Sequence, residues 1–116
     1  TFEYKNLKLD KLTYAKAEKV NVSVELTNTG IFDGKEVVQL YIRDVSASLS
    51  RPVKELKGFE LVELKKGETK TIRFTLTENE LGFFDNDGNY LVEPGTFKVF
   101  VGTNSDEVKE TEFVLK

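Results

Sequence analysis

The fold class is decided by the stretch Val20-Asn21-Val22-Ser23-Val24-Glu25-Leu26-Thr27-Asn28-Thr29-Gly30. Its apolar and polar residues alternate with period two, which is typical of a β-strand with one buried face. Asn and Gly tolerate the positive φ angles of tight turns, so the run is expected to stop at its last three residues. A strand of this kind needs a second layer to cover its apolar face.

The same alternation recurs along the rest of the chain. It appears in segments 2–9, 72–76, 97–101 and 108–115, with Asn, Asp, Gly and Pro clusters between them. About seven short strands at this spacing predict an all-β, two-sheet sandwich. The 116 residues are the length of one domain, so residues 1–116 are expected to form a single unit. One helical turn is expected at Glu78–Leu81, after the N-cap residue Thr77.

Composition excludes several classes of function. The chain has no Cys and no His, which removes disulfides, thiolate zinc sites, imidazole bases and Ser-His-Asp triads. Its net charge of −3 comes from interspersed signs without a basic block, so nucleic acid is not an expected partner. No apolar run approaches the roughly 20 residues needed to span a membrane. Localisation is left open, and the start at Thr1 suggests a segment excised from a longer chain.

One predicted strand is apolar on both sides. In Val37–Ile42, Val38, Leu40 and Ile42 form one face, while Val37 and Tyr41 place bulk on the other. A strand that is apolar on both faces is expected to be packed on both faces, whereas an isolated two-sheet sandwich leaves one face exposed to solvent.

Two further features point to the same uncovered face. Phe100, together with Tyr90, is expected to face away from the side chains that its neighbours bury. The longest connection, Arg43–Leu56, contains Arg51, Pro52 and Lys54, and long loops in compact domains often carry function. Proline biases the preceding Arg51 to an extended conformation, suited to pairing with a partner carboxylate.

The expected docking residues are therefore Val37, Tyr41, Phe100, Arg51, Pro52 and Lys54. The alternative for the long connection is that it folds onto its own sandwich.

Several blocks of the sequence closely resemble the fibronectin type III-like domain of glycoside hydrolase family 3. They cover nearly the whole chain, in the family's order and spacing. The blocks are Val20–Gly30, Glu36-Val37-Val38-Gln39-Leu40-Tyr41-Ile42-Arg43-Asp44, Arg51-Pro52-Val53-Lys54-Glu55-Leu56-Lys57-Gly58-Phe59, Leu64-Lys65-Lys66-Gly67-Glu68, Leu81-Gly82-Phe83-Phe84-Asp85 and Val92-Glu93-Pro94-Gly95-Thr96-Phe97.

The resemblance implies an immunoglobulin-like (fibronectin type III-like) sandwich at the C-terminal end of a β-glucosidase or β-xylosidase. In that family the nucleophile and the acid/base carboxylate lie on a barrel domain and an α/β domain, and no position of this chain matches them. The expected function is a non-catalytic accessory domain without a cofactor, whose partners are the catalytic domains of the same parent chain.

Alternative functions would each need particular residues to be exposed or paired. An independent carbohydrate-binding module would present an exposed aromatic platform, for which Tyr41, Tyr90 and Phe100 are the candidates; direct glycan contact is the less favoured reading. A cell-surface adhesion sandwich is a third reading. The carboxylate pairs Glu60/Glu63, Glu78/Glu80 and Asp85/Asp87 fall on or near turns or solvated strand faces, where catalysis is not expected. Asp85–Asn89 fails the spacing of a calcium loop and is read as a hairpin turn.

Overall fold

The alternating runs form seven long strands in the described part of the chain. The computed structural model describes residues 1–45, 54–84, 86–104 and 107–116. Its long strands are β1 (Phe2–Leu9), β3 (Val20–Asn28), β4 (Gly34–Asp44), β5 (Glu55–Leu64), β6 (Thr69–Leu76), β9 (Gly95–Gly102) and β10 (Val108–Leu115). Three two-residue strands complete the set, namely β2 (Thr13–Tyr14), β7 (Phe83–Phe84) and β8 (Tyr90–Leu91).

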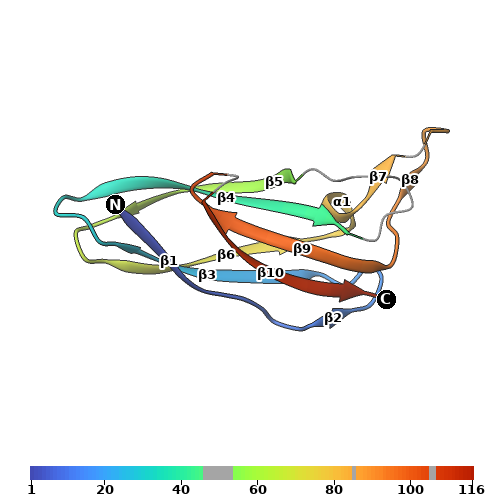
Figure 1. The fold of residues 1–116 in the computed structure, drawn as a ribbon, viewed down its shortest axis with the longest axis horizontal. Helices are drawn as coiled ribbons and strands as arrows, with labels where there is room; N and C mark the ends of the chain where they lie inside the picture. The colour runs from blue at the N-terminus through green and yellow to red at the C-terminus, as the bar shows by residue number, and fades with distance from the viewer. Residues whose placement is uncertain (46–53, 85, 105–106) are drawn as a thin grey trace.

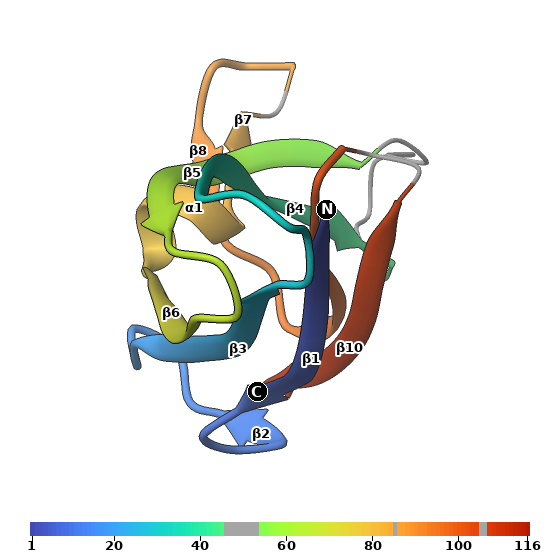
Figure 2. The same ribbon diagram turned by 90° about the vertical axis from the view of Figure 1, so that its left-hand side faces the viewer.

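Two sheets face each other in the predicted sandwich. One has the strand order β1-β3-β6 and the other the order β2-β10-β9-β4-β5, while β7 and β8 form a separate pair. All pairings are antiparallel except β2 with β10. Figure 2 looks along the long axis and shows the two layers around a common interior. The all-β, fibronectin type III-like fold class is confirmed. That residues 1–116 form a single domain stays a prediction.

The core forms where the apolar faces of the two sheets meet. From β3, Val20, Val22, Val24 and Leu26 are fully buried, as the alternation predicts. They belong to one cluster with inward side chains of the other sheet, which are Val38, Leu40, Ile42, Val62, Leu64, Phe97, Val99, Val101, Phe113 and Leu115. Phe113 stacks on Phe97 with ring centroids 5.3 Å apart and meets the edge of Tyr14 at 5.4 Å.

A buried asparagine joins the two layers at one end. Asn28 is the last residue of β3 and only 1% exposed. Its Nδ2 donates to the carbonyl oxygens of Phe32 (2.9 Å) and Leu64 (3.1 Å), and its Oδ1 accepts from the Gly30 N–H (2.9 Å). Because Leu64 ends β5 in the opposite sheet, this one side chain links both layers.

A short helix and a hairpin occupy the opposite end. Helix α1 (Glu78–Leu81) follows Thr77, whose side chain and the Glu80 carboxylate form the capping box. The β7–β8 hairpin projects beside it (Figure 1). The Tyr90 hydroxyl contacts the Glu78 and Asn79 carbonyl oxygens (2.8 and 2.9 Å) and accepts from the Gly82 N–H (3.1 Å). A Cβ at Gly82 would lie 2.4 Å from the Tyr90 ring, so only glycine allows this close approach.

We predict that Asn28→Ala lowers the free energy of unfolding of the 116-residue chain by about 2–3 kcal/mol, because buried backbone groups lose their partners. Urea unfolding followed by circular dichroism measures the change. Asn86→Ala, at an exposed turn position, is the matched control and is expected to change stability by less than about 0.5 kcal/mol. Equal midpoints for the two variants would contradict a linking role for Asn28.

We also predict that Tyr14→Phe raises the pKa of Asp10. The Tyr14 hydroxyl donates to the Asp10 carboxylate, as does Asn21 Nδ2 at 3.0 Å, and these bonds hold the Asp10 pKa below its ordinary value of 3.8. A lowered folded-state pKa contributes stability that is complete above the unfolded value and is lost as pH falls through the folded one. NMR titration of the Asp10 carboxyl carbon measures the pKa, and an identical pKa in the variant would rule out the hydroxyl as its main cause.

Candidate docking surface

The outer face of the five-stranded sheet carries a set of exposed apolar side chains. In β4, Val37 and Tyr41 point away from the core that Val38, Leu40 and Ile42 enter. The register places Leu61 of β5 opposite Val37 and Leu56 opposite Tyr41, and paired residues share a face.

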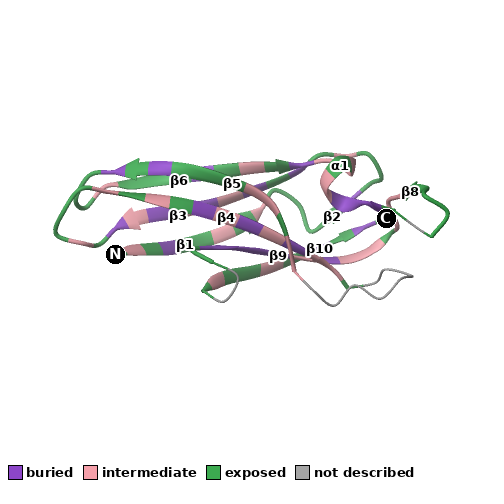
Figure 3. Ribbon diagram, turned by 90° about the horizontal axis from the view of Figure 1, so that it is seen from above, coloured by how far each residue is buried: buried purple, intermediate pink, exposed green. Residues whose placement is uncertain are grey.

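The apolar set is completed by Phe59, which lies opposite Gln39 between these two pairs. Leu56, Phe59 and Leu61 are 51%, 69% and 59% exposed, and Val37 is 39% exposed. We call Val37, Tyr41, Leu56, Phe59 and Leu61 the outer apolar surface. Figure 3, viewed from above Figure 1, shows exposed residues along much of β5, the edge strand of this sheet.

Sequence reasoning identified only the β4 half of this surface. The signal for the other half lies in Glu55–Leu64, where Leu61 and Val62 are apolar neighbours and therefore point to opposite faces. A register shift at Leu40/Tyr41 changes which β5 residues oppose β4. Because that shift interrupts the alternation, period-two counting does not assign Leu56 and Phe59 to the same face.

The expectation that Phe100 is exposed on this face is wrong. Phe100 lies opposite Tyr41 and so belongs to the outer side, but it is only 4% exposed. The Lys54 ammonium lies 4.4 Å from the centroid of its ring, in a cation–π contact. Lys54 therefore lies against its own sandwich, which is the alternative stated above for this connection. Arg51 and Pro52 lie outside the described residues.

The aromatic platform expected of a carbohydrate-binding module is not assembled. Phe100 is buried, and the Tyr41 hydroxyl donates to the side chain of Gln39 on the same strand. Tyr90 lies on the projecting hairpin, where its ring meets Phe84 edge-on at 5.0 Å and its hydroxyl is held by helix α1. These three rings thus do not form one exposed row.

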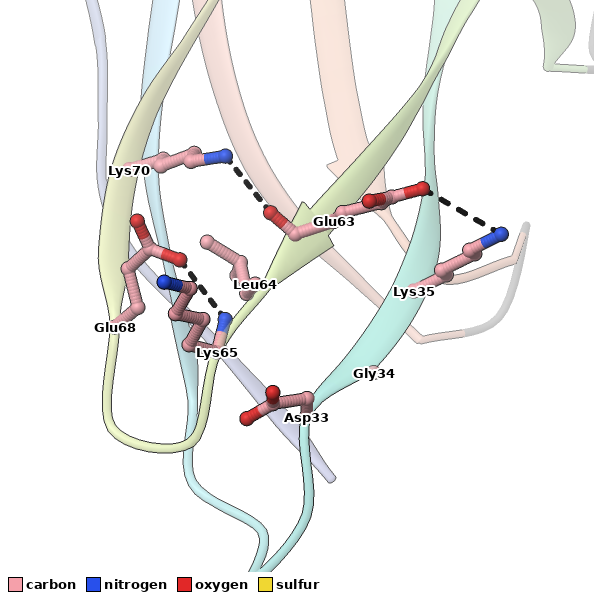
Figure 4. Close-up of a pocket in the computed structure, with 8 residues that line it drawn as sticks. All are labelled: Asp33, Gly34, Lys35, Glu63, Leu64, Lys65, Glu68 and Lys70. Atoms are coloured by element: carbon pink, nitrogen blue, oxygen red, sulfur yellow. Dashed lines mark hydrogen bonds and ion pairs between the residues drawn. The ribbon is translucent and has the colours of Figure 1, made fainter.

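A surface pocket of about 470 Å³ lies at the end of the sandwich that Asn28 links. Its lining is charged, and Figure 4 shows the side chains turned toward one another across the ends of β4, β5 and β6. Lys35 pairs with Glu63 at 3.4 Å, and Lys70 Nζ donates to the Glu63 carbonyl oxygen at 2.8 Å. The Glu68 carboxylate accepts from the Lys65 N–H at 2.8 Å. Through Glu63, these contacts link the ends of β4, β5 and β6.

One further candidate carboxylate, that of Glu80, also has structural partners. The Glu80 carboxylate accepts from the Thr77 N–H (2.7 Å) and Oγ1 (2.9 Å), which caps helix α1. Across the described ranges, no three His, Cys, Asp or Glu side chains gather in a way that suits a metal ion. Nor does any helix in those ranges have the length and apolarity to cross a bilayer.

The sequence and the fold both match known proteins. The family described as "Fibronectin type III-like domain" matches residues 36–105. The chain is 46% identical to the periplasmic beta-glucosidase of Salmonella typhimurium, over 99% of this chain and 15% of the relative. It is 47% identical to a beta-xylosidase of Formosa agariphila, over 100% of this chain and 16% of the relative.

Solved structures agree with these relatives. A β-glucosidase of Erythrobacter marinus superimposes with a TM-score of 0.96 at 39% identity, covering 100% of this chain and 15% of the other. The β-glucosidase of Listeria innocua in complex with glucose gives 0.93 at 43% identity, covering 99% and 16%. The chain thus spans about one sixth of the length of the proteins it matches. With the sandwich topology and the match over residues 36–105, the chain belongs to the fibronectin type III-like domain family.

Proposed function

We propose that the chain is a non-catalytic accessory domain of a larger β-glycosidase of the glycoside hydrolase family 3 type. It acts by docking its outer apolar surface against the catalytic part of the same polypeptide. The parent is an O-glycosyl hydrolase of the β-glucosidase or β-xylosidase type, and this domain contributes to its stability.

The lengths of the relatives support a larger parent. The matched segment is 15% of the Salmonella typhimurium beta-glucosidase and 16% of the Formosa agariphila beta-xylosidase. The remaining 85% and 84% of those proteins offer a surface on which a domain of this kind can dock.

The outer apolar surface is the single observation that carries the docking proposal. Three large side chains more than half exposed lie in a row on β5, beside Val37 of β4. Contiguous exposed apolar patches on a domain mark interaction surfaces. An uncovered edge strand is also a template for aggregation, which covering by a second domain prevents. Val37 and Tyr41 remain docking candidates, and Leu56, Phe59 and Leu61 join them. Arg51 and Pro52 stay predictions, because they lie outside the described residues.

Area burial supplies the stabilisation. Covering the exposed part of each of Leu56, Phe59 and Leu61 is worth roughly 1–2 kcal/mol before desolvation and ordering costs. The covalent link holds the two surfaces at high effective concentration, so a modest interface suffices.

We predict that the double substitution Phe59→Ser and Leu61→Ser destabilises the full polypeptide more than the 116-residue chain. In the short chain both side chains already face water, so the free energy of unfolding changes by less than about 1 kcal/mol. In the full polypeptide the thermal midpoint falls by several degrees because the interface loses apolar area. Calorimetry on both proteins measures the two shifts.

Leu12→Ser is the matched control for this experiment, because Leu12 is 78% exposed at a loop outside the outer apolar surface. It is expected to leave both thermal midpoints unchanged. At temperatures well below unfolding, kcat of the double variant stays that of the wild type, as a non-catalytic domain requires. A full polypeptide no more sensitive to the double substitution than to Leu12→Ser would contradict the docking.

A further inference from the structure

Strand β5 leaves one backbone edge of the five-stranded sheet open. It ends the strand order β2-β10-β9-β4-β5, so within the described residues only β4 pairs with it. In an edge strand, every second residue directs its N–H and C=O groups away from the sheet. The register shows which residues of β5 do so.

Phe59 and Leu61 direct their backbone groups to this open edge. The Val45 N–H donates to the Thr96 carbonyl oxygen at 3.0 Å, which continues the register of β4 with β9. Because the direction alternates along a strand, odd-numbered residues of β4 face β9 and even-numbered ones face β5. Over positions 58–64 the even-numbered residues of β5 lie opposite even-numbered residues of β4, so the odd-numbered ones face outward.

A side-chain contact at Glu63 agrees with this assignment. The Lys70 Nζ of β6 donates to the Glu63 carbonyl oxygen at 2.8 Å, drawn as a dashed line in Figure 4. That carbonyl group therefore points away from β4, as the alternation requires of an odd-numbered position. Because Lys70 bridges the two sheets here, the part of the β5 edge left open is residues 59–61.

Open space adjoins this part of the edge. A groove of about 370 Å³ lies between β5 and β6 and is lined by residues 60–63 and 70–73. Figure 2 shows the two strands at the same side of the sandwich, one in each layer. Phe59, Glu60 and Leu61 are all exposed, so the described part of the chain leaves this stretch of backbone accessible.

We propose that an extended segment of the parent polypeptide, from the part outside residues 1–116, adds to the sheet as a strand beside β5. This inference rests on the proposed function and deepens it by naming how the partner binds. Backbone hydrogen bonds join the segment to Phe59 and Leu61, and its apolar side chains extend the outer apolar surface. The chain spans only 15% and 16% of the two relatives named above, so the rest of the parent can supply the segment.

The neighbouring edge of β6 suits such a segment less well. The Asn28 N–H donates to the Glu68 carbonyl oxygen at 3.0 Å, in the register of β3 with β6, so Thr71 faces the groove with its backbone groups. The exposed side chains of β6 beside this edge include Thr71 and Arg73, which are polar. The β5 edge instead continues into the outer apolar surface, and apolar side chains beside the backbone favour pairing there.

The first experiment compares Leu61→Pro with Leu61→Ser. Both variants lose the leucine side chain, but only proline also removes the N–H group that faces the open edge. This N–H makes no bond to β4, so the two variants of the 116-residue chain are expected to unfold at rates within about threefold of each other. In the full polypeptide, thermal inactivation of Leu61→Pro is expected to be roughly tenfold faster than that of Leu61→Ser, because the added strand loses its hydrogen bond.

Thr71→Pro and Thr71→Ser are the matched control pair. They test the N–H group that faces the same groove from β6. The ratio of their inactivation rates is expected to be the same in the full polypeptide as in the 116-residue chain. A proline-specific effect at position 71 as large as that at position 61 would contradict pairing with β5.

Hydrogen–deuterium exchange at single-residue resolution tests the same pairing without a substitution. The amides of Phe59 and Leu61 are expected to exchange about tenfold or more slowly in the full polypeptide than in the 116-residue chain. The amides of Glu60 and Val62 face β4 in both proteins and are expected to change less.

Three further results would overturn the inference. These are an equal ratio of Leu61→Pro to Leu61→Ser rates in both proteins, unchanged exchange of the Phe59 and Leu61 amides, and a 116-residue chain that dimerises until Leu61→Pro is introduced, which would make a second copy the occupant. If the first two occur while Phe59→Ser with Leu61→Ser still destabilises the full polypeptide, docking stands and the added strand is wrong. If the apolar double variant has no effect either, the docking proposal itself fails.

Discussion

Burial of alternate apolar side chains between two facing sheets is the constraint on which the rest of the structure depends. Val20, Val22, Val24 and Leu26 from one sheet enter the same core cluster as the inward residues of β4 and β9. Because side chains alternate across a strand, filling this interior fixes which residues leave the sheet on the other side. The outer apolar surface is therefore a consequence of the core register, and shifting that register by one residue would exchange the two faces.

The two halves of the outer face differ in what covers them. Over β9, Phe100 is buried and holds the Lys54 ammonium against its ring. Over β5, Phe59 and Leu61 are more than half exposed, without such a cover among the described residues. Among the described residues, the outer face is therefore covered over Phe100 and exposed over Phe59 and Leu61. An exposed apolar area on a sheet face is expected of a partly hydrophobic interdomain interface.

Sequence patterns predicted the fold well because core alternation is a local signal. The strands at 2–9 and 108–115, the helical turn at 78–81 and the Thr77 cap all follow from residue order alone. The docking residues were predicted only in part, because exposure depends on neighbours distant in sequence. Phe100, for example, contacts Lys54, which lies in the connection between β4 and β5. The β5 half of the surface requires the register shift opposite Tyr41, which no periodicity reveals.

Hydrogen–deuterium exchange compared between the 116-residue chain and the full polypeptide tests the central claim most directly. Strand β5 is an edge strand, so backbone amides on its free side exchange readily in the short chain. If the outer apolar surface docks, amides of residues 55–64 exchange more slowly in the full polypeptide, while those of residues 69–76 on the other sheet change little. Identical exchange of residues 55–64 in both proteins would contradict the account.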